Sequence, residues 1–114
     1  MATKLMKQTD NYTYRITWSE VDKEYIGLCA EFPSLSWLDT TQETALQGII
    51  NLVAEAVSDM RANNETIPQP ISKKRFSGKL LVRIPPEVHK ELAIQAAEAG
   101  VSLNRIISAK LAKA

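Results

Sequence analysis

The chain has 114 residues, 45% of them hydrophobic, and carries 14 Lys and Arg against 13 Asp and Glu. This balance is typical of a globular protein, and no apolar run approaches the roughly 20 residues of a membrane-spanning helix. The first eight residues lack the apolar core of a signal peptide, so we expect a cytoplasmic protein without a membrane partner.

The charges divide unevenly along the chain. Residues 1–70 hold five basic and ten acidic residues, a net charge of −5, whereas residues 71–114 hold nine basic and three acidic residues, a net charge of +6. This pattern favours two modules with different partners, the basic one suited to a polyanion. A chance partition of surface charge is the alternative.

Cys29 is the only cysteine and His89 the only histidine. An internal disulfide and a Cys/His zinc cage are therefore excluded, and we expect no metal site and no cofactor. Cys29 lies in a predicted strand, where we expect it to be a small core residue. His89 lies beside charged residues of a predicted helix and is expected at the surface.

Alternating apolar and polar residues predict a strand over residues 12–18. A second strand is expected over residues 25–32 as its hairpin partner, with a short third strand over 34–38. A further strand near residues 66–72 is an open alternative, because the prolines there disfavour it.

Thr40 followed by Glu43 matches a capping box, so we expect a long helix from there to about Ala62. Its apolar stripe comprises Leu46, Ile49, Ile50, Val53, Val57 and Met60. An antiparallel sheet covered by one helix is a small α+β layer.

The second module is predicted to contain a strand over residues 78–84 and a helix that starts at Pro86 or Glu87. Gly100 is placed to end that helix in the left-handed conformation, and Ser102 to cap the next one. The apolar lines of the two helices are Val88, Leu92, Ala96 and Ala99, then Leu103, Ile106, Ile107 and Leu111.

Residues 77–114 are too few for a core of their own, and a lone strand needs a partner for its backbone groups. We therefore expect an intertwined homodimer in which the strands of two chains pair as an antiparallel ribbon. The predicted dimer core comprises Leu80, Val82, Ile84, Ile106 and Ile107.

Alternation places Lys79, Leu81 and Arg83 on the outer face of that ribbon, where they can contact base edges in the DNA major groove. The segment Ser102-Leu103-Asn104 at a helix N-terminus, followed by Arg105, can hold a phosphate. The alternative is a ribbon whose charges only keep it soluble.

The strand, Pro85, helix and the run Gly100-Val101-Ser102-Leu103-Asn104 resemble the ribbon-helix-helix family, which includes the Arc and MetJ repressors. The resemblance implies base contacts by the outer strand residues and a phosphate contact at the second helix. Leu81 departs from the polar residue often found at its position, which leaves the base preference open.

The whole chain after about residue 10 resembles the HicB family of antitoxins. The resemblance lies in the strand from Tyr12 to Trp18, the run from Tyr25 to Leu35, Trp37, and the helix start from Asp39 to Leu46. It implies a partly degenerate ribonuclease H-like module that blocks a HicA-type toxin, an RNA-cleaving protein, and a ribbon-helix-helix module that binds the operon's own promoter.

On this reading residues 1–70 form the toxin-binding domain, residues 71–76 a basic linker, and residues 77–114 the DNA-binding and dimerisation domain. Individual toxin contacts and any assembly beyond the dimer stay open. Phe32, Trp37 and Leu38 are candidate anchors for the partner, although we expect at least two of them to pack in the core.

Two other functions compete with the antitoxin reading. An active nuclease would need carboxylates converging on Mg²⁺, and exposed turn acids explain the acidic residues better. A free-standing repressor would use its first module to sense a ligand or partner. The acidic residues in question are Glu20, Asp22, Glu24, Glu31 and Asp39.

Overall fold

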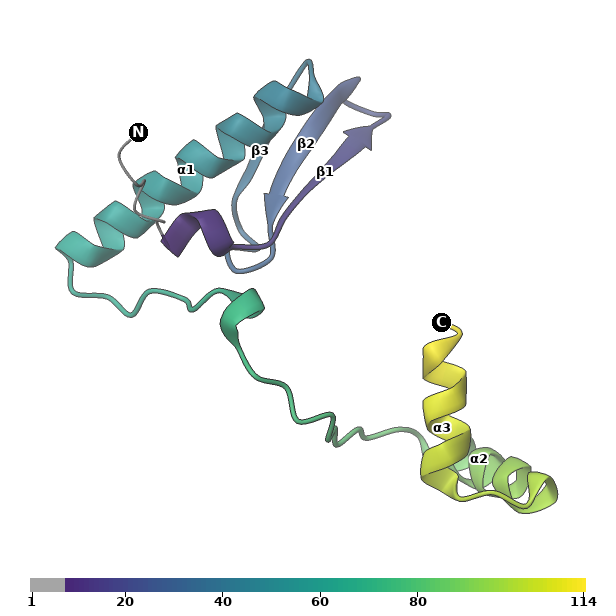
Figure 1. The fold of residues 1–114 in the computed structure, drawn as a ribbon. Coiled ribbons are helices and arrows are strands. Elements are labelled where there is room, and N and C mark those ends of the chain that lie inside the picture. The colour runs from purple at the N-terminus through teal and green to yellow at the C-terminus, as the bar shows by residue number, and fades with distance from the viewer. Residues whose placement is uncertain (1–7) are drawn as a thin grey trace, which may run out of the picture. The chain divides into compact units, whose positions relative to one another are not determined.

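The computed structural model describes residues 8–114, which form two compact units. One unit ends at Phe76 and the other spans Ser77–Ala114, and each is described by itself (Figure 1). No helix among the described residues is long and apolar enough to cross a membrane.

The first unit is a three-stranded antiparallel sheet with one long helix across it (Figure 1). Its elements are η1 (Gln8–Asn11), β1 (Tyr14–Ser19), β2 (Glu24–Cys29), β3 (Ser36–Asp39), α1 (Gln42–Ala62) and η2 (Ile71–Lys73). The strands lie in the order β1-β2-β3, with Ile16 opposite Gly27 and Gly27 opposite Trp37. The predicted α+β layer is confirmed.

Strand β2 ends earlier than predicted, at Cys29 rather than Phe32. The amide of Phe32 donates to the carbonyl oxygen of Cys29, and the amide of Leu35 donates to that of Phe32. These two local turns take the backbone out of the extended conformation, so β3 also starts later than predicted, at Ser36.

Helix α1 is capped by Thr41, not by Thr40 as the capping box predicted. The Thr41 hydroxyl accepts a hydrogen bond from the amide of Thr44 at 3.1 Å. The amide of Thr40 instead donates to the Asp39 carboxylate at 2.8 Å, which holds Thr40 in the turn before the helix. The predicted end at Ala62 is confirmed.

The core of the first unit lies between α1 and the sheet and contains Tyr12, Cys29, Phe32, Ile49, Val53 and Val57. Tyr12 and Phe32 stack edge to face with their ring centroids 5.4 Å apart. Cys29 is a core residue, as expected. Leu46 was predicted on the buried stripe, but it lies at the helix flank and is 38% exposed.

The segment near residues 66–72 does not form a strand. The chain runs from the end of α1 back toward the sheet and ends in the short helix η2 (Figure 1). The Tyr12 hydroxyl donates to the carbonyl oxygen of Pro68 at 2.6 Å, and the Ser72 hydroxyl donates to that of Asn11 at 2.8 Å. These side-chain hydrogen bonds hold the segment in place of the backbone hydrogen bonds of a strand, which prolines cannot donate.

The second unit contains α2 (Pro86–Ala99) and α3 (Leu103–Ala112). Helix α2 starts at Pro86, Gly100 has a φ of 67° at its end, and the Ser102 hydroxyl caps α3, so these three predictions are confirmed. Residues 78–84 form no strand within this single chain.

Candidate nucleic-acid interface and partner surface

The segment over residues 79–84 exposes an unusual amount of apolar surface. Leu80 is 79% exposed, Leu81 is 90% exposed and Val82 is 59% exposed. Soluble chains rarely leave contiguous apolar surface in water unless a partner covers it. Among the described residues this segment belongs to no sheet, so no strand of its own chain pairs with its backbone groups.

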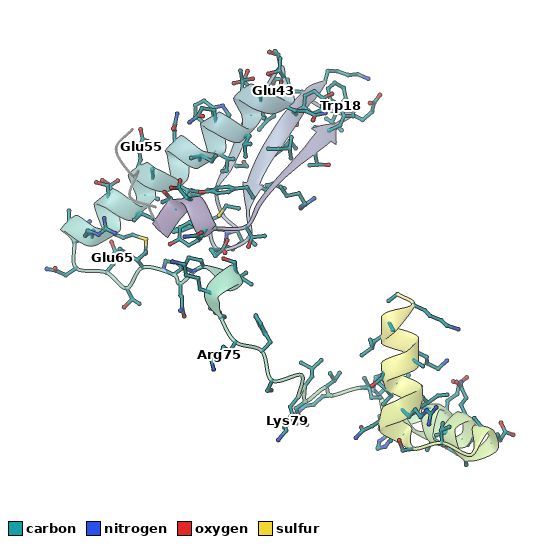
Figure 2. All side chains as sticks on the ribbon, in the orientation of Figure 1. Trp18, Glu43, Glu55, Glu65, Arg75 and Lys79 are labelled. Atoms are coloured by element: carbon teal, nitrogen blue, oxygen red, sulfur yellow. The ribbon has the colours of Figure 1, made fainter. Side chains whose placement is uncertain are left out.

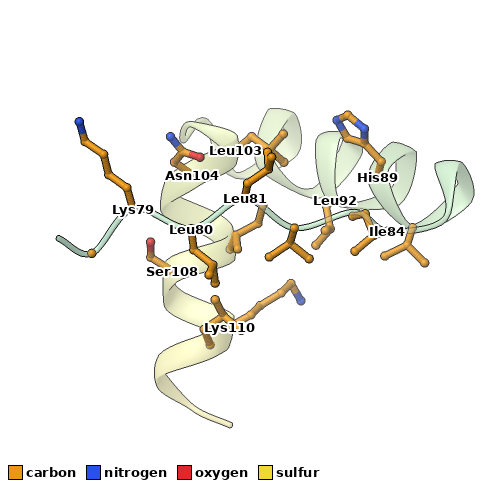
Figure 3. Close-up of a pocket in the computed structure, with 15 residues that line it drawn as sticks. Lys79, Leu80, Leu81, Ile84, His89, Leu92, Leu103, Asn104, Ser108 and Lys110 are labelled. Atoms are coloured by element: carbon orange, nitrogen blue, oxygen red, sulfur yellow. The ribbon is translucent and has the colours of Figure 1, made fainter. Parts of the chain in front are cut away.

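The same segment lines a groove of about 780 Å³ together with α2 and α3 (Figure 3). The apolar side chains along it are Leu80, Leu81, Val82, Ile84, Val88, Leu92, Leu103, Ile107 and Leu111. Four of the five predicted dimer-core residues therefore line the same groove. The fifth, Ile106, is half-buried but does not line the groove.

The single chain does not separate the segment into an inner and an outer face. Lys79 and Leu81 were predicted on the outer face, yet both line the groove beside Leu80 and Val82. The amine end of Lys79 extends away from the helices (Figure 3). Side chains alternate between two faces in a β-strand, and residues 78–84 form no strand in the single chain.

The N-terminus of α3 presents unused backbone donors. The Ser102 hydroxyl accepts from the amide of Arg105 at 3.1 Å, while the amides of Leu103 and Asn104 donate to no acceptor among the described residues. These amides lie at the positive end of the helix dipole, and Arg105 is exposed beside them. Leu103 and Asn104 line the same groove as Lys79, whereas Arg83, Ser102 and Arg105 do not.

His89 is exposed on α2, as predicted, and it also lines this groove. Its place there follows from the helix period, because Val88 and Leu92 line the groove on either side of it in the sequence. The sequence pattern alone did not indicate a groove at His89, because residues 78–84 and α3 meet α2 there only through packing.

In the first unit, α1 covers one face of the sheet and leaves the other uncovered (Figure 1). A Cβ at Gly27 would lie 2.6 Å from the carbonyl oxygen of Ala45, so Gly27 faces the helix. The alternate residues Ile26, Leu28 and Leu38 therefore lie on the uncovered face, where Ile26 is paired with Leu38. We call these three residues the open apolar face.

Aromatic residues are also exposed at this unit. Trp37 is 42% exposed and Leu38 is 39% exposed, so the expectation that at least two of Phe32, Trp37 and Leu38 pack in the core was wrong. The indole of Trp37 lies over Gly48 rather than inside the core. Trp18, which was not predicted as a partner anchor, is 47% exposed and lies at the same end of the first unit as Glu43 (Figure 2). Its position at the end of a predicted strand, next to a polar turn, is the feature of the sequence that could have indicated this exposure.

The acidic side chains of the first unit are engaged in local hydrogen bonds. Glu20 accepts from Lys23 and from the Trp18 indole, which lowers the pKa of its carboxyl below the usual range. Asp39 accepts from the amide of Thr40 and from the Trp37 indole, and these bonds lower its pKa.

Asp22 bonds to the hydroxyl of Ser19 in the same turn. Within residues 8–114 no group of three or more His, Cys, Asp or Glu side chains could hold a metal ion.

One comparison with known proteins gives a match. The HicB family model matches residues 62–111. The match begins at the end of α1 and covers the connection, the segment over residues 78–84, α2 and nearly all of α3. It spans fewer than half of the residues, supports membership of the HicB family and indicates a role related to toxin–antitoxin systems. No curated protein and no solved structure matches the chain.

Proposed function

We propose that this protein is the antitoxin of a HicAB-type pair. Its first unit neutralises an RNA-cleaving toxin of HicA type, and its second unit binds the promoter of the operon as a homodimer. The observation that carries this proposal is the match of the HicB family model to residues 62–111. No catalytic residue is assigned, because the antitoxin acts by binding.

The DNA-binding half of the proposal rests on pairing of residues 78–84 between two chains. Pairing supplies the missing backbone hydrogen bonds and covers apolar side chains that are exposed in the single chain. The dimer core then comprises Leu80, Val82, Ile84, Ile106 and Ile107. Since pairing also restores the pleat, the alternate residues Lys79, Leu81 and Arg83 turn to the outer face and contact bases.

The phosphate contact follows from the geometry of α3. The free amides of Leu103 and Asn104 donate hydrogen bonds to a DNA phosphate oxygen, Ser102 positions them as the helix cap, and Arg105 adds a full positive charge. Such contacts position the protein on the duplex without reading its sequence.

The toxin-binding half rests on charge and exposed apolar surface. A protein that cleaves RNA needs a basic surface for its substrate, and residues 1–70 carry a net charge of −5. The open apolar face adds apolar contact area, and the exposed Trp18 and Trp37 are aromatic anchors of the kind that is enriched at interfaces.

Co-expression tests this proposal. The product of the adjacent small open reading frame is expressed alone and together with this chain, and growth and co-purification are measured. Growth arrest by the neighbour alone, rescue by co-expression and a stable complex are expected. A harmless neighbour that does not co-purify would overturn the antitoxin role and would favour a free-standing repressor if the chain still binds its promoter.

A further inference from the structure

Three consecutive basic residues precede the proposed ribbon strand in the sequence. Lys73, Lys74 and Arg75, which we call the basic arm, are all exposed, as is the adjacent Phe76 at 75%. Among residues 8–114, no acidic side chain forms an ion pair with the basic arm or with Lys79. The fold of the chain therefore leaves these charges uncompensated.

The backbone at the start of the basic arm is held in place. The amide of Ile71 donates to the Glu31 carboxylate at 2.9 Å, and the amides of Lys73 and Lys74 close the η2 turn by donating to Pro70 and Ile71 at 3.0 Å. Ile71, Lys73 and Lys74 take part in these bonds through their backbone only. The cationic side chains of the basic arm form no ion pair with the other described residues and are free to contact a partner.

The length of the chain constrains where these cations lie when the ribbon is bound. The major groove is about 12 Å wide, and the four residue-to-residue steps from Arg75 to Lys79 span at most about 14 Å. A chain that enters the groove at Lys79 must therefore cross the adjoining sugar-phosphate backbone close to Arg75. Duplex DNA carries one negative charge per about 1.7 Å of its axis, so phosphates are dense at that crossing.

We propose that the basic arm contacts the DNA phosphates that flank the groove occupied by the ribbon. This inference rests on the proposed DNA-binding function and extends its contact surface beyond the second unit's own residues. The arm supplies affinity that depends on salt and does not depend on base sequence, while Lys79, Leu81 and Arg83 supply the base preference.

The test uses the full-length chain and its triple variant K73Q/K74Q/R75Q. Binding to a duplex of the chain's own promoter and to a scrambled duplex is measured between 50 and 200 mM salt. If each chain of a dimer loses one phosphate contact, the slope of log K against log salt falls in magnitude by about 1.8. The loss of affinity over this salt range is then about tenfold smaller than for the unsubstituted protein. The ratio of promoter to scrambled affinity stays the same.

A matched variant, R61Q/K90Q/K113Q, removes three exposed cations elsewhere and is expected to keep the original salt slope. Thermal unfolding by circular dichroism establishes that both variants are folded. An unchanged slope in the arm variant, or an equal change in both variants, would overturn this inference alone. If the unsubstituted chain fails to bind its promoter duplex, the DNA-binding function itself is overturned, and this inference with it.

Discussion

The Glu31 carboxylate accepts a hydrogen bond from the backbone amide of Ile71 at 2.9 Å, across 40 positions of the sequence. It also accepts from the amide of Thr13 at 2.9 Å, so one side chain joins the start of the sheet to the chain that leaves α1. Burial acts to raise the pKa of Glu31, but the bonds from Ile71 and Thr13 outweigh it, and the pKa is lowered from its usual value of 4.5.

The first prediction concerns this carboxylate and pH. A group whose pKa is lower in the folded state stabilises the fold fully above its unfolded pKa, and that contribution is lost as the pH falls through the folded pKa. We expect Glu31→Gln to cost about 1–2 kcal/mol at pH 7, because one of its two acceptor oxygens becomes an NH₂ group that cannot accept. The difference in unfolding free energy between this variant and the unsubstituted protein should shrink below pH 4.5.

Urea unfolding at several pH values measures this effect. Glu65→Gln is the control, because the exposed Glu65 side chain accepts no hydrogen bond from the other described residues. A pH-independent cost for Glu31→Gln would contradict the assigned role of the carboxylate.

The second prediction compares two glycines under α1. A Cβ at Gly27 would lie 2.6 Å from the carbonyl oxygen of Ala45 and 2.8 Å from Ile49 Cγ2, and the helix backbone cannot move aside. We expect Gly27→Ala to cost about 2–3 kcal/mol by overpacking. At Gly48 the added Cβ would lie 2.0 Å from Trp37 Cδ1, so the indole must rotate away and lose its hydrogen bond to Asp39. The indole is partly exposed and can move, and the preference of a helix for alanine, about 1 kcal/mol, offsets part of the cost.

Equilibrium denaturation should therefore show Gly48→Ala to be milder than Gly27→Ala. The reverse order would mean that the Trp37 indole yields less to an added Cβ than the backbone of α1 does.

Local patterns predicted the elements well wherever one residue type determines the backbone. Pro86 started α2 and Gly100 ended it as expected, because the proline ring fixes φ near its helical value and glycine adopts a positive φ without a steric penalty. The cap of α1 was misplaced by one residue, since both Thr40 and Thr41 can act as caps and only the bond from the Thr40 amide to Asp39 distinguishes them.

The sequence could not decide features that depend on packing or on a second chain. Periodicity placed Leu46 on the apolar stripe, but the side chain is 38% exposed at the flank of α1. The predicted strand over residues 78–84 is absent from the single chain. A strand needs a second strand for its backbone hydrogen bonds, and the sequence pattern of one segment does not show where that second strand lies. The DNA contacts assigned to Lys79, Leu81 and Arg83 stay predictions for the same reason.

The third prediction separates stability from phosphate binding at Ser102. Removing the α3 cap by Ser102→Ala should cost about 1 kcal/mol of stability and should weaken DNA binding. Ser102→Asp retains the cap, but it places a negative charge at the proposed phosphate seat. This variant should keep the stability of the protein and lose affinity for the promoter and for a scrambled duplex alike. Unchanged DNA binding by Ser102→Asp would remove the N-terminus of α3 from the interface.

The fourth prediction concerns the homodimer. Val82→Lys places a charge at the proposed dimer core and should abolish the dimer, as measured by sedimentation of the full-length protein over a dilution series. Val21→Lys is the control, because Val21 is 93% exposed in the β1–β2 turn and should leave the dimer intact. An unsubstituted chain that sediments as a folded monomer at micromolar concentration would contradict the intertwined ribbon.

The most direct test of the account asks whether toxin neutralisation and promoter binding are separable in one chain. Growth rescue and promoter repression are measured in the same cells for the unsubstituted protein and for Arg83→Ala. If Arg83 contacts a guanine, its loss should relax base preference by about 1–3 kcal/mol, so repression should fall while rescue stays complete. Loss of rescue together with repression, or full repression by Arg83→Ala, would contradict the assignment of DNA recognition to the second unit and toxin binding to the first.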